Sequence, residues 1–129
     1  MKVLVDTHIW LWWLEGSPKL GASARRLLSD GANELLWSAA STWELAIKLQ
    51  LGKLRLGQGL DEFLLRMFGS YGLTPLPVHH AHASRVATLP LIHRDPFDRL
   101  LVAQSAVEGV PLLTADPLLR QYGIECLDP

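Results

Sequence analysis

The sequence predicts a single α/β domain with three layers (α/β/α), in which a central, mostly parallel sheet lies between helices. Two observations lead to this fold class. Short apolar segments with strand character alternate with longer segments of helical periodicity along the whole chain. The 129 residues are also 49% hydrophobic and only 19% charged, which provides a core and excludes a disordered chain. No repeat or linker interrupts this pattern, so residues 1–129 are expected to form one domain.

The first half of the chain is expected to contain two strands and four helices. Val3–Val5 is apolar at every position, which is typical of a central parallel strand. A helix over Thr7–Leu14 follows and ends at the Gly-Ser-Pro sequence of residues 16–18. The next elements are a helix over Ala22–Ser29, a strand over Glu34–Trp37, a helix from an N-cap at Ser38 to about Leu51, and an amphipathic helix over Leu60–Phe68.

The second half continues the alternation. Leu73–Val78 carries two prolines, so it is at best a weak strand. Helical segments are expected over His79–Leu89 and Pro96–Glu108. The last two strands are expected over Leu112–Thr114 and Ile124–Leu127.

Four carboxylates stand at the predicted strand ends and helix starts. Asp6 and Asp116 each follow a strand, whereas Glu44 and Asp98 lie in the opening turns of helices. Working sites in parallel sheets lie beyond the carboxyl ends of the strands, so these acids are expected to converge there. Like charges repel unless a cation holds them, and the four acids therefore indicate a divalent metal site.

Each acid also has a local explanation. Three of the four precede or open a helix, where a carboxylate can cap the helix or complement its dipole. Glu44 could complete a capping box with Ser41 or pair with Lys48 four residues later. Capping does not explain why all four acids fall on one side of the sheet, so we favour the shared site.

Four groups of residues form a series of motifs along essentially the whole chain. They are Asp6-Thr7-His8, Trp43-Glu44 with Lys48 and Gly52-Lys53-Leu54, the run from His93 to Arg99, and Thr114-Ala115-Asp116. In this order they resemble the successive signatures of a PIN domain, and the likeness is greatest to the VapC-type toxins of bacterial toxin–antitoxin pairs. This resemblance implies a PIN-like fold and a metal-dependent endoribonuclease that hydrolyses RNA phosphodiester bonds.

The resemblance implies a role for each acid. Asp6, Glu44 and Asp98 match the first three metal-binding and catalytic acids of the family. Asp116 matches a fourth position, which varies more and is often asparagine in relatives.

Two threonine hydroxyls and a fifth acid lie in the same motifs as the four carboxylates. Thr114 matches a position that helps to hold the acids or a metal-bound water, and Thr7 could act similarly. Asp95 is an additional acid of the subgroup resembled here. We interpret it as the N-cap before Pro96.

Carboxylates suit the implied reaction. Phosphodiester hydrolysis needs an activated water and cations that neutralise the charge developing on the phosphoryl group. Mg²⁺ or Mn²⁺ can provide both, and Mg²⁺ keeps several waters, so two or three carboxylates suffice. The sequence leaves open whether one ion or two is bound.

The basic residues and histidines are weighed separately. The net charge of −1 gives no broad basic surface, so RNA binding must depend on a local patch and on metal ions. A zinc site at His79 and His82 lacks further compact ligands, and His8 and His93 are expected to make structural hydrogen bonds near the acids. The candidates for RNA-phosphate contacts, each of which could instead be part of a solvated surface, are Lys48, Lys53, Arg55, Arg94 and Arg99.

Two apolar segments are expected to form interfaces. The helix over Thr7–Leu14 is apolar almost all round, and Leu60–Phe68 has an apolar stripe, while the mean hydropathy of +0.17 is high for a small chain. We therefore expect a homodimer. The resemblance adds a cognate antitoxin whose tail buries one or more of Trp10, Trp12 and Trp13 and sends an Arg towards the carboxylates.

The chain is expected to be cytoplasmic and to lack a membrane partner. Its one cysteine, Cys126, cannot form an internal disulfide, and no apolar run is long enough to span a bilayer. Asp6 interrupts the only stretch that resembles a signal peptide.

Two other functions remain open. A receiver domain of a phosphorelay also places acids and a Thr around Mg²⁺, but it needs a lysine after the last strand, where this chain has Leu127-Asp128-Pro129. It also gives no reason for Glu44. A PIN fold could instead serve as a non-catalytic interaction module, although intact acids argue against it.

Overall fold

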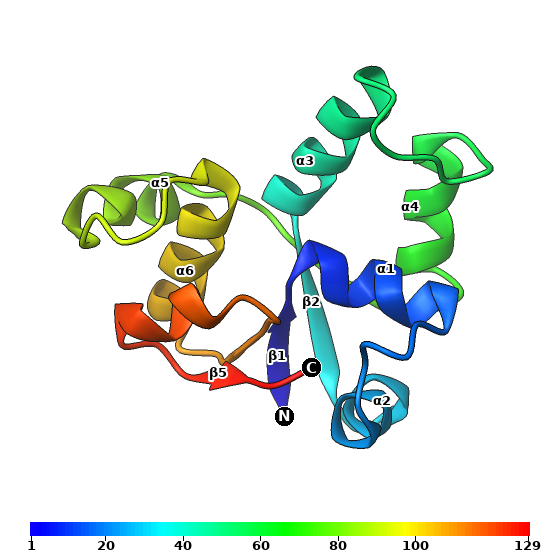
Figure 1. Cartoon of the computed structure of the whole chain (residues 1–129), viewed down its shortest axis with the longest axis horizontal. Coiled ribbons are helices and arrows are strands. Elements are labelled where there is room, and N and C mark those ends of the chain that lie inside the picture. The colour runs from blue at the N-terminus through cyan, green and yellow to red at the C-terminus, as the bar shows by residue number, and fades with distance from the viewer.

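The computed structural model describes residues 1–129, and its centre is a five-stranded sheet in which every paired strand is parallel (Figure 1). The order across the sheet is β3-β2-β1-β4-β5, which confirms the predicted α/β class. The strands are short, with two to five residues each. They are β1 (Lys2–Val5), β2 (Glu34–Ser38), β3 (Thr74–Leu76), β4 (Leu112–Leu113) and β5 (Cys126–Leu127).

Helices cover both faces of this sheet. In Figure 1, α1, α2 and α4 lie on one side of β1 and β2, and α5 and α6 lie on the other. The chain crosses from one side to the other between β3 and α6. The helices are α1 (Thr7–Glu15), α2 (Ala22–Ser29), α3 (Ala39–Gln50), α4 (Leu60–Phe68), α5 (His80–Arg85) and α6 (Pro96–Glu108), with 3₁₀ turns η1 (Val86–Thr88) and η2 (Pro117–Tyr122).

Side chains that alternate along the strands fill two separate cores. Val3 and Val5 of β1 belong to a core with α1, α2 and α4, whereas Leu4 belongs to a second core with α6. All three are fully buried. This alternation is the expected consequence of a strand whose successive side chains point to opposite faces.

Three elements of the second half of the chain differ from the predicted ones. The predicted strand over Leu73–Val78 shortens to Thr74–Leu76, and it is an edge strand, where Pro75 costs no interior ladder bond. The predicted helix over His79–Leu89 is an α-helix only to Arg85 and continues as a 3₁₀ turn. The turn η2, which begins at Pro117, was not predicted.

The two apolar segments expected at interfaces belong largely to the core of the single chain. Trp10 is 1% exposed, so the predicted burial of this tryptophan by a partner is wrong. Phe63 and Met67 are also buried in the core, although both line a groove between α1 and α4. Trp12 and Trp13 are partly buried against the same core, and Lys19 lies 5.1 Å from the centre of the Trp12 ring. A helix between a sheet and a second helix can be apolar on several sides without needing another subunit.

None of the helices has both the length and the apolar character needed to cross a membrane.

Candidate active site

The site lies where the strand order reverses, between β1 and β4. From β1 the chain builds β2 and β3 outward on one side, then returns to build β4 and β5 on the other. Asp6 follows β1, and its backbone N–H donates to the carbonyl of Leu113 in β4 (3.0 Å). Asp116 follows β4 by three residues. Crevices of this kind are the usual binding sites of open α/β sheets.

Thr114 links the acids of these two strands. Its Oγ1 donates to Oδ2 of Asp6 over 2.7 Å and accepts the backbone N–H of Asp116 over 3.1 Å. The residue is 4% exposed, so this hydroxyl is shielded from competing water. The expected supporting role of Thr114 therefore has a defined geometry: it orients one acid by its side chain and the other by its backbone.

Asp6 is the most deeply placed of the acids that follow strands, at 5% exposure. Burial raises the pKa of its carboxyl, and the charge of Glu44 raises it further, while the bond from Thr114 opposes this. Its side chain makes no capping hydrogen bond to α1. The local explanation of Asp6 as a helix cap is therefore wrong.

Asp98 enters the site from the first turn of α6. The Asp95 carboxylate caps this helix, accepting the N–H groups of Phe97 (2.8 Å) and Asp98 (3.3 Å), and Pro96 occupies the first helical position, as expected. Burial raises the pKa of Asp98 to about 7, and the charges of Asp6, Asp95 and Glu44 raise it while His93 lowers it. Asp98 thus lies within the mutual field of the other acids.

Glu44 reaches the site from α3 and is 5% exposed. Its Oε2 accepts a hydrogen bond from the Lys48 ammonium over 2.8 Å, one helical turn later. The alternative capping box with Ser41 is not formed, because Ser38 is the N-cap and accepts the N–H of Ala40. The predicted pairing with Lys48 is present, and it leaves Glu44 among the acids rather than at the helix end.

Asp116 serves two purposes. Its Oδ1 accepts the N–H of Leu118 over 2.9 Å, so the predicted N-cap is present. Its Oδ2 points the other way, towards His93. A carboxylate offers about four acceptor positions, so capping does not exclude a metal from this side chain.

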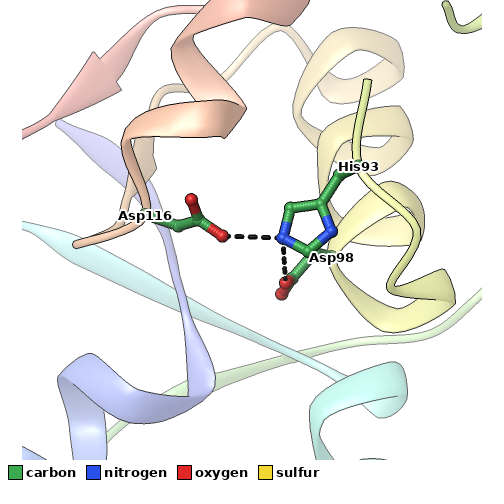
Figure 2. A group of neighbouring side chains, drawn as sticks. All are labelled: His93, Asp98 and Asp116. Carbon is green, nitrogen blue, oxygen red and sulfur yellow. Dashed lines mark hydrogen bonds and ion pairs between the residues drawn. The ribbon is translucent and has the colours of Figure 1, made fainter. Parts of the chain in front are cut away.

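His93 stands between the acids of β4 and α6, as Figure 2 shows. Its Nε2 lies 2.7 Å from Oδ2 of Asp116 and 3.2 Å from Oδ2 of Asp98. The three side chains offer ligand atoms that all lie within 4.8 Å of one another. The expected structural hydrogen bonds of His93 are present, and they join two of the acids, which the sequence does not predict.

The residues at this site fit a hard divalent cation. The side chains of Asp6, Glu44, Asp98 and Asp116 present carboxylate oxygens, the donors that Mg²⁺ and Mn²⁺ prefer. Two buried hydroxyls in the helices that carry these acids, Oγ1 of Thr7 and Oγ of Ser41, have no hydrogen-bond partner in the protein.

The candidate RNA-binding residues divide into three groups. Lys48 lies at the site, whereas Lys53, Arg55 and Arg94 are exposed side chains outside it. Arg99 is already engaged, because Nη1 donates to the Pro90 carbonyl (2.8 Å) and to Tyr122 Oη (3.1 Å). The proposed phosphate contact of Arg99 is therefore replaced by a structural role in the loop before α6.

Comparison with known proteins decides the family. Residues 3–125 match the PIN domain family. This chain belongs to the PIN domain family.

Two relatives of this PIN domain are ribonucleases by name. It is 29% identical over 123 residues to Ribonuclease VapC22 of Mycobacterium tuberculosis (strain ATCC 25618 / H37Rv), covering 93% of this chain and 91% of that protein. It is 38% identical over 71 residues to Ribonuclease VapC16 of the same organism, covering 52% and 50%.

The fold of the PIN domain is also shared with solved structures. One is the VapBC2 complex of Rickettsia felis bound to a promoter DNA fragment (TM-score 0.73, 14% identity, 99% of this chain and 98% of that one). Another is DNA-bound VapBC of Salmonella typhimurium (TM-score 0.70, 16% identity, 99% and 98%). At these identities the likeness establishes the three-layer architecture.

Two residues of the PIN domain site were missed or misplaced by sequence reasoning. Ser41 was assigned to a capping box, although it lies inside α3 with its hydroxyl buried. His93 was expected only near the acids. The position of Ser41, three residues before Glu44 on a helix, is a signal that could have placed it on the same side.

Proposed function

We propose that this PIN domain is a metal-dependent endoribonuclease that hydrolyses RNA phosphodiester bonds and acts as the toxin of a toxin–antitoxin pair. The observation that carries the proposal is the convergence of acids from separate elements: Asp6, Glu44 and Asp98 lie close enough for the charges of the first two to raise the pKa of the third. A group of acids that disfavours its own ionisation becomes stable when a cation binds. Family membership and the ribonuclease names of the relatives support the choice of reaction.

In this proposal Asp6, Glu44, Asp98 and Asp116 hold Mg²⁺ or Mn²⁺ and form the catalytic group. The bound cation supplies an activated water and neutralises charge on the phosphoryl group. Thr114 orients the Asp6 carboxylate, and Thr7, the next residue in the chain after Asp6, is proposed to support the same acid.

Basic and aromatic side chains beside the site are proposed to bind the RNA strand. Lys48, Lys53 and Arg94 contact phosphates, and Lys48 is already positioned by Glu44. Trp43 is 61% exposed and packs edge-on against Phe97, with ring centres 5.1 Å apart. These rings adjoin Glu44 and Asp98 in the chain, and an exposed indole can stack on a nucleobase.

A cognate antitoxin is the proposed protein partner, and the neighbouring VapBC complexes support this choice. An apolar groove of about 270 Å³ lies between α1 and α4 and offers a place for an antitoxin side chain. Charged side chains at this groove, including Arg55 and Arg66, would complement an acidic segment. Of the tryptophans expected at this interface, Trp10 is buried in the core, whereas Trp12 and Trp13 are only partly buried and stay in the proposal. A homodimer and a cytoplasmic setting are also part of the proposal.

The test of this function uses the purified chain with a single-stranded RNA. We expect cleavage with Mn²⁺ or Mg²⁺ and none in excess EDTA, and we expect either metal to raise the thermal midpoint by mass action. Undiminished cleavage in chelator would exclude the metal mechanism. Metal binding without cleavage of any RNA would favour the non-catalytic interaction module.

A further inference from the structure

We infer that His93, whose Nε2–H is shared between the carboxylates of Asp98 and Asp116, is a positioning residue for the proposed nuclease site. The inference rests on the proposed function in that it assigns these acids to a metal. Figure 2 shows His93 with its contacts to Asp98 and Asp116. In the proposed arrangement these two acids bind the metal and His93 does not.

The proton on the ring follows from its other nitrogen. Nδ1 of His93 accepts the backbone N–H of Asp95 over 3.0 Å, so Nδ1 carries no proton. A neutral imidazole has a single N–H, which must then be at Nε2. Nε2 faces the two Oδ2 atoms at 2.7 Å and 3.2 Å, and both are acceptors when ionised.

The loop that carries His93 is held in place by hydrogen bonds to Tyr122 and Arg99. The backbone N–H of His93 donates to Tyr122 Oη over 2.8 Å, and the same oxygen accepts from Arg99. Arg99 also donates to the Pro90 carbonyl three residues before His93. The ring is therefore fixed by contacts at its backbone, at Nδ1 and at Nε2, and its side chain is only 18% exposed.

This arrangement determines what His93 can do for a metal. If Nε2 bound a cation directly, it would have to lose its proton, and the bond from Asp95 to Nδ1 would have to break. As an N–H donor, the ring instead holds two repelling carboxylates together and leaves each with unused lone pairs. The first coordination sphere is then made of oxygen, which suits Mg²⁺.

Nitrogen NMR of the ring tests the assignment directly. In protein labelled with ¹⁵N-histidine, the His93 signals should report a protonated Nε2 and an unprotonated Nδ1, both without metal and with saturating Mg²⁺. Loss of the Nε2 proton on adding Mg²⁺ would make His93 a ligand and would overturn the inference. The measurement requires no RNA cleavage, so it remains valid even if the chain proves not to be a nuclease.

Two variants with amide side chains distinguish the roles of the two ring nitrogens. In His93→Gln the side-chain NH₂ can reach the position of Nε2, whereas in His93→Asn it reaches only the position of Nδ1. We expect His93→Gln to keep Mg²⁺ affinity within about threefold, and His93→Asn to lose about 10-fold or more, the usual scale for residues that orient ligands.

Calorimetric titration with Mg²⁺ measures both affinities, and circular dichroism establishes that both variants are folded. Equal losses in the two variants, or no loss in His93→Asn, would overturn the inference. If one variant fails to fold, the NMR result on the unaltered protein decides. A wild-type chain that binds Mg²⁺ but cleaves no RNA would contradict the proposed function and leave the role of His93 intact.

Discussion

His82 and His93 make the same set of hydrogen bonds in two different regions of the molecule. In each ring Nδ1 accepts a nearby backbone N–H, from His79 (3.0 Å) and from Asp95 (3.0 Å) respectively, and Nε2 meets a carboxylate. His82 is 1% exposed and its Nε2 meets one carboxylate, that of Glu108, whereas Nε2 of His93 meets two carboxylates at the end of the sheet.

The difference shows that the local pattern does not by itself make a functional residue. At His82 the pattern joins α5 to α6, and Gln104 in α6 adds a contact to the carbonyl of Pro77. At His93 the same pattern acts on Asp116 and on Asp98, whose carboxylate lies in the field of Asp6 and Glu44. The surroundings therefore decide whether such a histidine stabilises the fold or prepares a site.

The largest expected effect is the loss of catalysis on removing a site charge. Asp6→Asn keeps an oxygen to accept the bond from Thr114 but removes the charge, so cleavage of RNA should fall by more than about 100-fold. Asp98→Asn should behave likewise and Asp116→Asn more mildly. Glu108→Gln, at the other histidine, is the matched control and should leave the cleavage rate unchanged.

The same Asp6→Asn variant should be at least as stable as the wild type without metal. The pKa of Asp6 is raised on folding, so its ionised form destabilises the folded state at neutral pH. Thermal unfolding in EDTA checks this. Unfolding of the variant, or full activity, would mean that Asp6 has a structural role instead.

A second prediction removes the structural histidine. His82→Ala leaves a cavity and an unpaired backbone N–H at His79, so the free energy of unfolding should fall by about 2–4 kcal/mol. Mg²⁺ affinity should stay unchanged under conditions where the variant is folded. Urea unfolding and calorimetry measure the two quantities, and a weakened metal site would contradict the separation of the two regions.

The third prediction concerns pH. The pKa of Asp98 is about 7 in the folded, metal-free protein, above its ordinary value of 3.8. Between these two pH values the folded state keeps the proton of Asp98, whereas the unfolded state has lost it. The contribution of Asp98 to the free energy of unfolding is therefore fully present below about pH 4 and is lost as the pH rises through about 7.

Metal binding should show the opposite dependence on pH. A cation must displace the proton of Asp98, so Mg²⁺ affinity should fall about tenfold between pH 8 and pH 6. Calorimetry at both pH values measures the change. An affinity independent of pH in the wild type, or an equal dependence in Asp98→Asn, would exclude Asp98 as the titrating group.

The smallest expected effect is at the surface. Arg94→Ala should weaken RNA binding about equally for all sequences and reduce the slope of log affinity against log salt by about 0.7, the value for one single-strand phosphate contact. Arg26→Ala in α2, which lies away from α3 and α6 in Figure 1, is the control and should leave the slope unchanged. Equal slopes in all three proteins would remove Arg94 from the RNA-binding surface.

The sequence alone determined the α/β class and most helix boundaries, because strand and helix periodicities and cap residues are local. The helices over Ala22–Ser29, Leu60–Phe68 and Pro96–Glu108 were predicted with their observed bounds. The order of acids along the chain also predicted where they meet, since the carboxyl ends of parallel strands share one edge.

Only the tertiary structure decided which side chains face inward and which pairs meet. Trp10 and Met67 are core residues because α1 and α4 are covered by the sheet and by each other, which helical periodicity cannot reveal. The bonds of Thr114 to Asp6 and of His93 to Asp116 join residues 108 and 23 positions apart. Such bonds depend on how strands and helices pack, so composition and spacing supply the chemical groups, and packing sets their geometry.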